Sequence, residues 1–261
     1  MIQIAQGIGE NMVELFTYSL SYSTVSLLFL TAFLIGMAKT GVSGVSMFSV
    51  PVMAIIFGGK ESSGLMLPLL IMADLFAVRY YHRHANWSYL LKLFPSAALG
   101  VIIATVVGHY IDDQLFQLIM GIIIFLSLGI MLWIETANKE AVPDYLWFAI
   151  LMGLLGGFTT MIGNLAGAVM ALYLLSMRLP KNEFIGTAAW FFLVINLFKL
   201  PFHIFSWQTI DINSFLLNLT SLPFIALGAY GGVHIVKHIP EKQYRWLILT
   251  VTAIAALIMI I

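Results

Sequence analysis

The 261-residue sequence has no cysteine and few charges: 9% of its residues are charged, against about 25% in ordinary soluble domains. Without cysteine, the chain has no disulfide, no thiolate metal site and no thiol nucleophile. The formal net charge is zero and no basic run is present, so we expect no binding to nucleic acid. The first twenty residues contain Glu10 and Glu14 but no Lys or Arg. A cleaved signal peptide is therefore not expected.

The chain is instead rich in apolar residues. Hydrophobic residues make up 61% of the chain, and the mean hydropathy is +0.99. Apolar segments of about 20 residues recur along the whole length, which is long enough to cross a hydrocarbon core of about 30 Å as a helix. No alternating strands of about ten residues occur, which argues against a β-barrel. The sequence predicts an all-α polytopic membrane protein.

We expect ten helical segments in one transmembrane domain covering residues 1–261. Repeat 1 would cover about 20–134 and repeat 2 about 145–261, with a charged connector at 135–144. The segments of repeat 1 are predicted at 20–38, 44–57, 62–81, 88–109 and 114–134. Those of repeat 2 are predicted at 145–158, 162–177, 182–204, 213–236 and 243–261.

Similar residues at a constant spacing indicate that the two halves are copies of one another. At a spacing of 128 positions, residues of the first half match Pro223, Gly228, Gly232 and Glu241; they are Pro95, Gly100, Ala104 and Asp113. At a spacing of 122, Gly64 and Asp74 match Gly186 and Asn196. The order and lengths of the segments also agree, so we predict a duplication.

Loop charges predict that the two copies cross the membrane in opposite directions. The connector after the third segment contains Arg79 and Arg83, whereas its counterpart after the eighth contains Asp211 and no Lys or Arg. The connector after the fourth is acidic, and its counterpart after the ninth is basic. Because Lys and Arg mark the cytoplasmic side, we expect inverted repeats in the cell (inner) membrane, with both termini on the non-cytoplasmic side.

Two predicted segments are too short to span a membrane. The segments 44–57 and 145–158 have 14 residues each, or about 21 Å of helix. We therefore expect the first two segments of each repeat to form a short or re-entrant hairpin whose polar tip ends near the midplane. The polar residues of the two tips are Lys39, Thr40 and Ser43, and Thr159, Thr160 and Asn164.

Each tip would begin a half-helix, and the free N–H groups and positive dipole end of a helix start suit an anion. Lys39 would add a full positive charge. These features favour an anion site between the tips. The alternative is that the Lys39 side chain extends to an interface and that the glycines serve helix packing.

Other polar residues in apolar segments are further candidates. Asp74 lies inside the third segment, where it either couples transport to protons or pairs with Lys39 or Lys199. Asn196 and Lys199 share one helical face and either line the path or reach the interface. Trp190 either walls the site or packs. No metal site and no cofactor are predicted.

Two ordered sets of short motifs carry a family resemblance. The first-half set is Lys39-Thr40-Gly41, Pro51, Gly64, Pro68, Asp74, Tyr80-Tyr81, His84-Ala85 and Trp87. The second-half set is Phe158-Thr159-Thr160, Asn164, Gly167, Pro180-Lys181, Phe184, Gly186-Thr187, Trp190-Phe191-Phe192, Asn196, Lys199 and Pro201. With these motifs the chain resembles the TauE/SafE family of sulfite and organosulfonate exporters. The resemblance implies a transporter of small sulfur-containing anions such as sulfite, thiosulfate or organosulfonates.

The leading hypothesis is a secondary transporter, an exporter of such an anion, with a midplane site between the tips. A passive anion channel is the alternative within transport, and an integral-membrane enzyme or sensor is the alternative outside it. The expected partners are the lipid bilayer, the anion, protons as the coupling ion and a second copy of the chain in a homodimer. An enzyme is not favoured, because no nucleophile–base pair or metal constellation is present.

Overall fold

The computed structural model of the chain describes residues 12–42, 45–112, 114–116, 118–119, 122, 125–126, 145–240, 243–244, 246–247 and 250. Its described part is a bundle of helices preceded by a small β-hairpin, β1 (Met12–Leu15) and β2 (Tyr18–Ser21). The first half contains α1 (Tyr22–Lys39), η1 (Val45–Phe48), α2 (Ser49–Phe57), α3 (Gly59–Tyr81), η2 (His82–His84) and α4 (Trp87–Val107). The second half contains α6 (Leu146–Gly163), α7 (Ala166–Ser176), α8 (Lys181–Pro201), η3 (Phe202–Ser206), α9 (Ile212–Leu219) and α10 (Leu222–His238).

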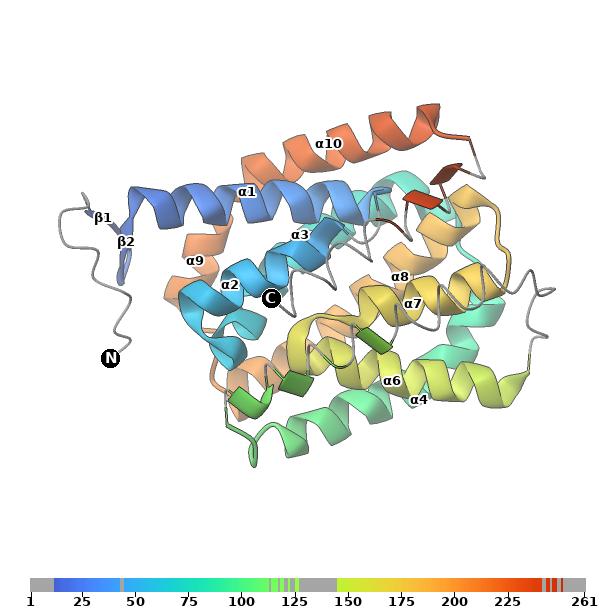
Figure 1. Cartoon of the computed structure of the whole chain (residues 1–261), viewed down its shortest axis with the longest axis horizontal. Coiled ribbons are helices and arrows are strands. Elements are labelled where there is room, and N and C mark those ends of the chain that lie inside the picture. The colour runs from blue at the N-terminus through green and yellow to red at the C-terminus, as the bar shows by residue number, and fades with distance from the viewer. Residues whose placement is uncertain are drawn as a thin grey trace.

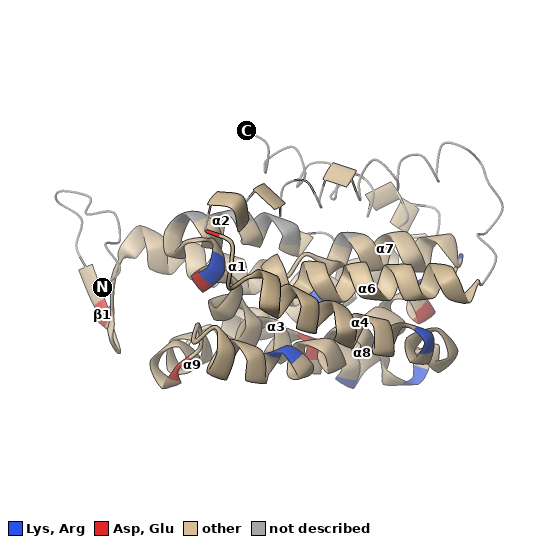
Figure 2. Cartoon of the chain, turned by 90° about the horizontal axis from the view of Figure 1, so that it is seen from below, with Lys and Arg blue, Asp and Glu red and all other residues tan. Residues whose placement is uncertain are grey.

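Among the described residues, five helical stretches are long and apolar enough to cross a membrane, and a bent sixth is formed by α9 and α10. They support the prediction of a helical, multi-pass membrane protein, to which the structure adds the small hairpin β1–β2. Figure 2 shows that most of the helical ribbon bears no charged residue, in keeping with the apolar segments. The predicted segments 114–134 and 243–261 lie largely outside the described residues.

Two long helix pairs frame the bundle. Helix α1 lies along α10, and α4 lies along α6, with the remaining helices between the pairs (Figure 1). Each pair joins one helix of the first half to one of the second half. The two halves are therefore interlocked, and α3 and α8 meet at the centre.

Glycines allow both pairs to approach closely. A Cβ on Gly157 of α6 would overlap the carbonyl oxygen of Ala97 in α4, and one on Gly36 of α1 would overlap the carbonyl oxygen of Ile225 in α10. Ala97 and Ile225 are 128 positions apart, the spacing already noted between the halves. The same kind of backbone contact thus recurs in both pairs, and small residues let helices pack this closely in lipid.

Helix α6 corrects the predicted short segment 145–158. It runs to Gly163 and has 18 residues, about 27 Å of helix. The predicted segment ended at Phe158, whereas the helix continues through both threonines that follow. The Thr159 hydroxyl donates to Gly156 O, 3.3 Å away within the same helix, a bond that a threonine can make without leaving the helix. The predicted short segment 44–57 does contain a short helix, α2, with 9 residues, and the other short α-helices among the described residues are α7, with 11, and α9, with 8.

Two further boundaries differ from the prediction. The expected helix 213–236 is broken at Thr220 and Ser221, and α9 and α10 meet at 51°. Helix α9 has its own start, a capping box in which Asp211 Oδ1 accepts from the Ser214 backbone N–H. At the other end of the chain, Leu20 belongs to β2 rather than to the first helix. Helix α1 begins after Ser21, whose hydroxyl accepts from the Thr24 N–H as an N-cap.

Candidate functional site

A small cavity lies where α1, η1, α3, α6, α7 and α8 meet. Its volume is about 50 Å³, several times the roughly 10–15 Å³ that one water needs by the same measure. Apolar side chains form part of its wall, and polar side chains come from five positions, namely Lys39, Ser46, Thr160, Asn164 and Asn196. The cavity therefore combines an apolar wall with convergent polar groups, the usual composition of a small-ligand site.

A second, larger hollow has a different character. This groove, of about 820 Å³, lies against α3, α8 and α9, and nearly all of its lining is apolar, with Arg79 and Asp211 as its charged residues. An apolar groove of this kind is compatible with contact to lipid chains in a membrane protein. It lacks the convergent polar groups that a small anion needs, so the smaller cavity is the candidate site.

Lys39 is the last residue of α1 and extends into the cavity wall. Its Nζ lies 2.9 Å from Asp74 Oδ1 and 3.8 Å from the centroid of the Phe192 ring. Lys39 ends α1, and the next helical element, η1, begins at Val45. A cation at this position is favoured by the negative end of the helix dipole and by the face of the aromatic ring.

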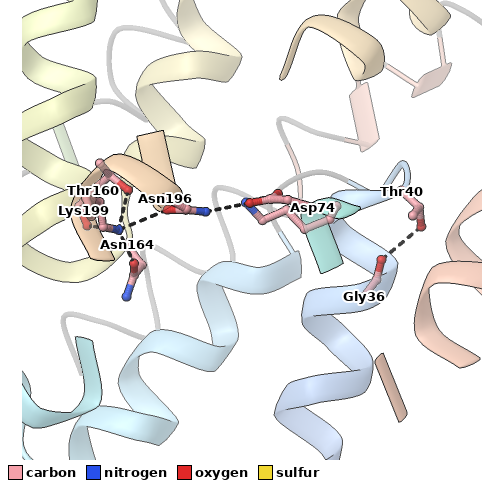
Figure 3. A network of polar contacts seen from close by, with 8 residues as sticks. Gly36, Thr40, Asp74, Thr160, Asn164, Asn196 and Lys199 are labelled. Carbon is pink, nitrogen blue, oxygen red and sulfur yellow. Dashed lines mark hydrogen bonds and ion pairs between the residues drawn. The ribbon is translucent and has the colours of Figure 1, made fainter. Parts of the chain in front are cut away.

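Asp74 of α3 connects Lys39 to the second half of the chain. Its side chain is fully buried, and its second oxygen, Oδ2, accepts from Asn196 Nδ2 at 2.7 Å. The ion pair with Lys39, one of the two pairings expected from the sequence, is present. Figure 3 shows Asp74, Asn196 and Lys199 following one another across the centre of the molecule.

Lys199 of α8 is also fully buried. Its Nζ donates to Asn164 Oδ1 at 2.6 Å, Thr160 O at 2.8 Å, Thr160 Oγ1 at 3.1 Å and Asn196 Oδ1 at 3.2 Å. Three of these atoms are carbonyl oxygens, which accept only. Three acceptors require three N–H donors, which an ammonium has and a neutral amine lacks. The geometry therefore fits a charged Lys199.

Asn164 holds the turn between α6 and α7 and points its amide at Lys199. Its backbone is left-handed, with φ 58°, a conformation that asparagine tolerates better than most residues. Its Nδ2 donates to Ser63 O of α3 at 2.9 Å, which leaves Oδ1 for Lys199. Helix α7 begins two residues later, and Gly167 in its first turn lines the cavity. A positive helix end therefore adjoins the polar wall.

Counted with its side chains ionised, the central network holds two cations, Lys39 and Lys199, and one anion, Asp74. Among the described residues, Lys199 contacts no carboxylate, since its partners are Thr160, Asn164 and Asn196. The one carboxylate of the network, Asp74, is paired with Lys39. Two cations thus share one anion in a buried setting, where an uncompensated charge is costly. An anion entering the cavity would supply the missing negative charge.

Other predicted residues point elsewhere. Thr40 donates its hydroxyl to Ala229 O of α10 at 2.8 Å and to Gly36 O at 3.0 Å, on the side away from Lys199 (Figure 3). Thr159 is buried within α6. The Trp190 ring packs against that of Trp87, tilted by 52° with the ring centroids 5.1 Å apart. Ser43 lies outside the described residues.

Ser46 and Phe192 are among the cavity residues that the sequence analysis did not predict. Ser46 of η1 lies three residues after Ser43 of the predicted tip, and this position was the available signal. Phe192 forms the wall that was expected from Trp190. Two residues along a helix turn the side chain by about 200°, so Phe192 faces the cavity and Trp190 faces α4.

His234 and His238 lie one turn apart on α10, with ring centroids 4.9 Å apart. In the described part of the chain, no group of three or more His, Asp or Glu side chains comes together. His238 Nδ1 instead lies 2.8 Å from the backbone oxygen of His234. This pair belongs to the exposed end of α10.

A multi-pass helical bundle with a buried, net positive network beside a small polar cavity has the architecture of a membrane transporter for anions. Comparison with known families agrees with this class. Residues 28–259 match the family described as Sulfite exporter TauE/SafE, and the chain belongs to that family. Its members are membrane transporters of sulfur-containing anions rather than enzymes. No curated protein matches the chain.

Proposed function

We propose that the protein is a secondary exporter of a small sulfur oxyanion, such as sulfite, thiosulfate or an organosulfonate, and binds it in the cavity beside Lys39. The observation that carries this proposal is the buried network of two lysines and one carboxylate. The Lys39 ammonium would contact the anion directly, because Lys39 lines the cavity. Lys199 lies behind Thr160 and Asn164 and would contribute its charge through them.

The neutral polar groups of the wall suit the oxygens of such an anion. Asn164, Asn196, Thr160 and Ser46 line the cavity. Hydroxyl and amide groups can donate to sulfur-bound oxygens, and the first-turn N–H groups of α7 near Gly167 can do the same. The small volume, about 50 Å³, favours a compact anion over a large conjugate.

Alternating access would follow from two inverted repeats. Three features support this proposal. Asp74 and Asn196, which are 122 positions apart, bond to each other at the centre; the pair α1 and α10 corresponds to the pair α6 and α4; and equivalent loops carry opposite charge. In such an arrangement one repeat rocks against the other around a fixed midplane site.

Reporters test the predicted sidedness. Alkaline phosphatase fused to the C-terminus should be active in intact cells, and green fluorescent protein at the same point should be dark, because we expect a non-cytoplasmic end. The opposite pattern would overturn the orientation. It would leave the anion site untouched.

Transport itself is tested in proteoliposomes loaded with sulfite, thiosulfate or methanesulfonate. The proposal requires saturable flux of at least one of these anions. Flux that rises linearly with concentration would favour the passive channel instead. Selective transport of carboxylates would exclude a sulfur oxyanion as the substrate.

Two variants test the cavity in independent ways. Lys39→Met removes the contacting charge, and Ser46→Phe fills the cavity without touching the ion pair; both should abolish flux. Lys237→Met is the matched control, because Lys237 is an exposed lysine near the end of α10, 5.4 Å from the Tyr80 ring centroid. Wild-type flux in folded Lys39→Met and Ser46→Phe proteins would reject the site.

A further inference from the structure

The orientation of each side chain in the network is fixed by its neighbours. Asn164 Nδ2 must face Ser63 O, because a carbonyl oxygen only accepts. Its Oδ1 is therefore turned to Lys199. Asn196 likewise turns Nδ2 to the Asp74 carboxylate and Oδ1 to Lys199. The pattern fits an ionised Asp74 and a charged Lys199, and with these charges the network holds one excess positive charge.

That single excess charge matches one kind of anion. A monoanion in the cavity brings the buried cluster to neutrality. A dianion leaves one negative charge in excess, and an unmatched charge in a buried site costs several kcal/mol. The excess disappears when one proton is added to the cluster. Asp74 is the carboxylate of the network and the one group there that can take up a proton.

We propose that Asp74 sets the charge of the transported anion: ionised, it matches the site to a monoanion, and protonated, it admits a dianion. This inference rests on the proposed anion site. Protonation of Asp74 would also release Lys39 from its ion pair. Lys39 already lines the cavity, so the freed ammonium would turn wholly to the anion. A dianion would then travel with one proton, and a monoanion with none.

The charged groups around Asp74 are few. Lys39 faces it from α1, and Lys199 lies beyond Asn196 on α8. Among the described residues of the other helices packed on α3, no further charged group acts strongly on this carboxylate. A further buried titratable side chain, His203, lies one turn beyond Lys199, and its Nδ1 is 2.8 Å from Thr209 Oγ1. His203 is therefore the competing proton acceptor that an experiment must separate from Asp74.

Binding of two probes to the purified wild-type protein at several pH values is the first test. Methanesulfonate is a monoanion and thiosulfate a dianion, and neither changes its charge near neutral pH. Uptake of one proton with thiosulfate predicts that its Kd rises by about tenfold for each unit of pH above the range in which Asp74 titrates. The Kd of methanesulfonate should not rise with pH. Equal pH dependence for both probes would overturn the proposal.

Asp74→Asn is the second test, because the amide has the shape of a protonated carboxyl. In this variant thiosulfate binding should lose its pH dependence, and methanesulfonate binding should weaken at least tenfold relative to thiosulfate. His203→Gln should keep the wild-type pH dependence. If the dependence vanishes in His203→Gln and persists in Asp74→Asn, the proton belongs to His203 and the proposal is wrong.

The outcomes distinguish this inference from the proposed function. If wild-type protein binds neither probe nor sulfite at any pH, the anion site itself fails. If it binds the probes without a difference in pH dependence, only the charge-matching role of Asp74 fails. The first test uses wild-type protein alone. It can therefore refute the proposal even if a variant of the second test does not fold.

Discussion

Two adjacent glycines in α6 allow a sharp test of how closely the helices pack. A Cβ at Gly157 would overlap the backbone carbonyl of Ala97 in α4. One at Gly156 would meet only Phe191 Cζ at 3.5 Å and Val169 Cγ1 at 3.9 Å, which are ordinary contacts. Gly157→Ala should therefore force α4 and α6 apart, whereas Gly156→Ala should fit the existing space.

The expected effects have opposite signs. Overpacking at Gly157 should destabilise the protein by about 1–3 kcal/mol. At Gly156, alanine should stabilise the helix by up to about 1 kcal/mol, because glycine is the poorer helix former. The variants should then differ by about 1–4 kcal/mol. The free energy of unfolding in mixed detergent and dodecyl sulfate micelles, followed by circular dichroism, measures the difference.

The opposite helix pair provides a repetition of the experiment. In α10 a Cβ at Gly231 would meet nothing within 4 Å, whereas one at Gly232 would overlap the Thr40 hydroxyl. Gly232→Ala should be destabilising and Gly231→Ala should not. Equal stabilities within each adjacent pair would refute the close packing of both helix pairs. A loss confined to one pair would refute it for the other.

The remaining predictions concern buried and capping charges. Lys199→Met should destabilise the protein by about 1–3 kcal/mol, measured as above, because three buried carbonyl acceptors lose their donor; no loss would mean that the network is dispensable for stability. Lys39→Met alone leaves the buried Asp74 carboxylate without its ion-pair partner. The double variant Lys39→Met/Asp74→Asn should therefore be more stable than the single variant Lys39→Met; additive losses would argue against the ion pair. A hydrogen bond from the Ser214 backbone N–H holds the pKa of the Asp211 carboxyl below its usual value. This bond stabilises the protein above the unfolded-state pKa and is lost as pH falls through the folded-state pKa. Asp211→Asn keeps a cap but should remove this acid-dependent loss from thermal melts, and an unchanged acid profile would reject the assignment.

Sequence periodicity predicted the long apolar helices well and the interruptions poorly. The segments 62–81 and 88–109 agree with α3 and α4 to within a few residues. The break at Thr220 and Ser221 was missed, because the apolar run continues through both halves of the bent pair. A start signal was nevertheless present in Asp211, whose capping box begins α9 well before the bend.

The sequence indicated several of the polar residues that line the candidate site, but not which way each side chain points. Lys39, Asn164, Asn196 and Thr160 do line one cavity, because polar residues in apolar segments have few places to go. Thr40 faces α10 instead, since neighbouring residues on a helix point about 100° apart. Which side of α1 faces α10 depends on contacts across the two halves of the chain, and a single sequence does not reveal them.

The surplus charge of the central network has an electrical consequence. In the export cycle proposed above, a monoanion neutralises Lys39, Lys199 and Asp74 together while it is carried, and the emptied site returns as a cation. A membrane voltage that is negative inside does work on that return, about 2.3 kcal/mol for each elementary charge moved through 100 mV. The voltage would thus draw the emptied carrier back to the cytoplasmic face and leave the outward, loaded step electrically silent.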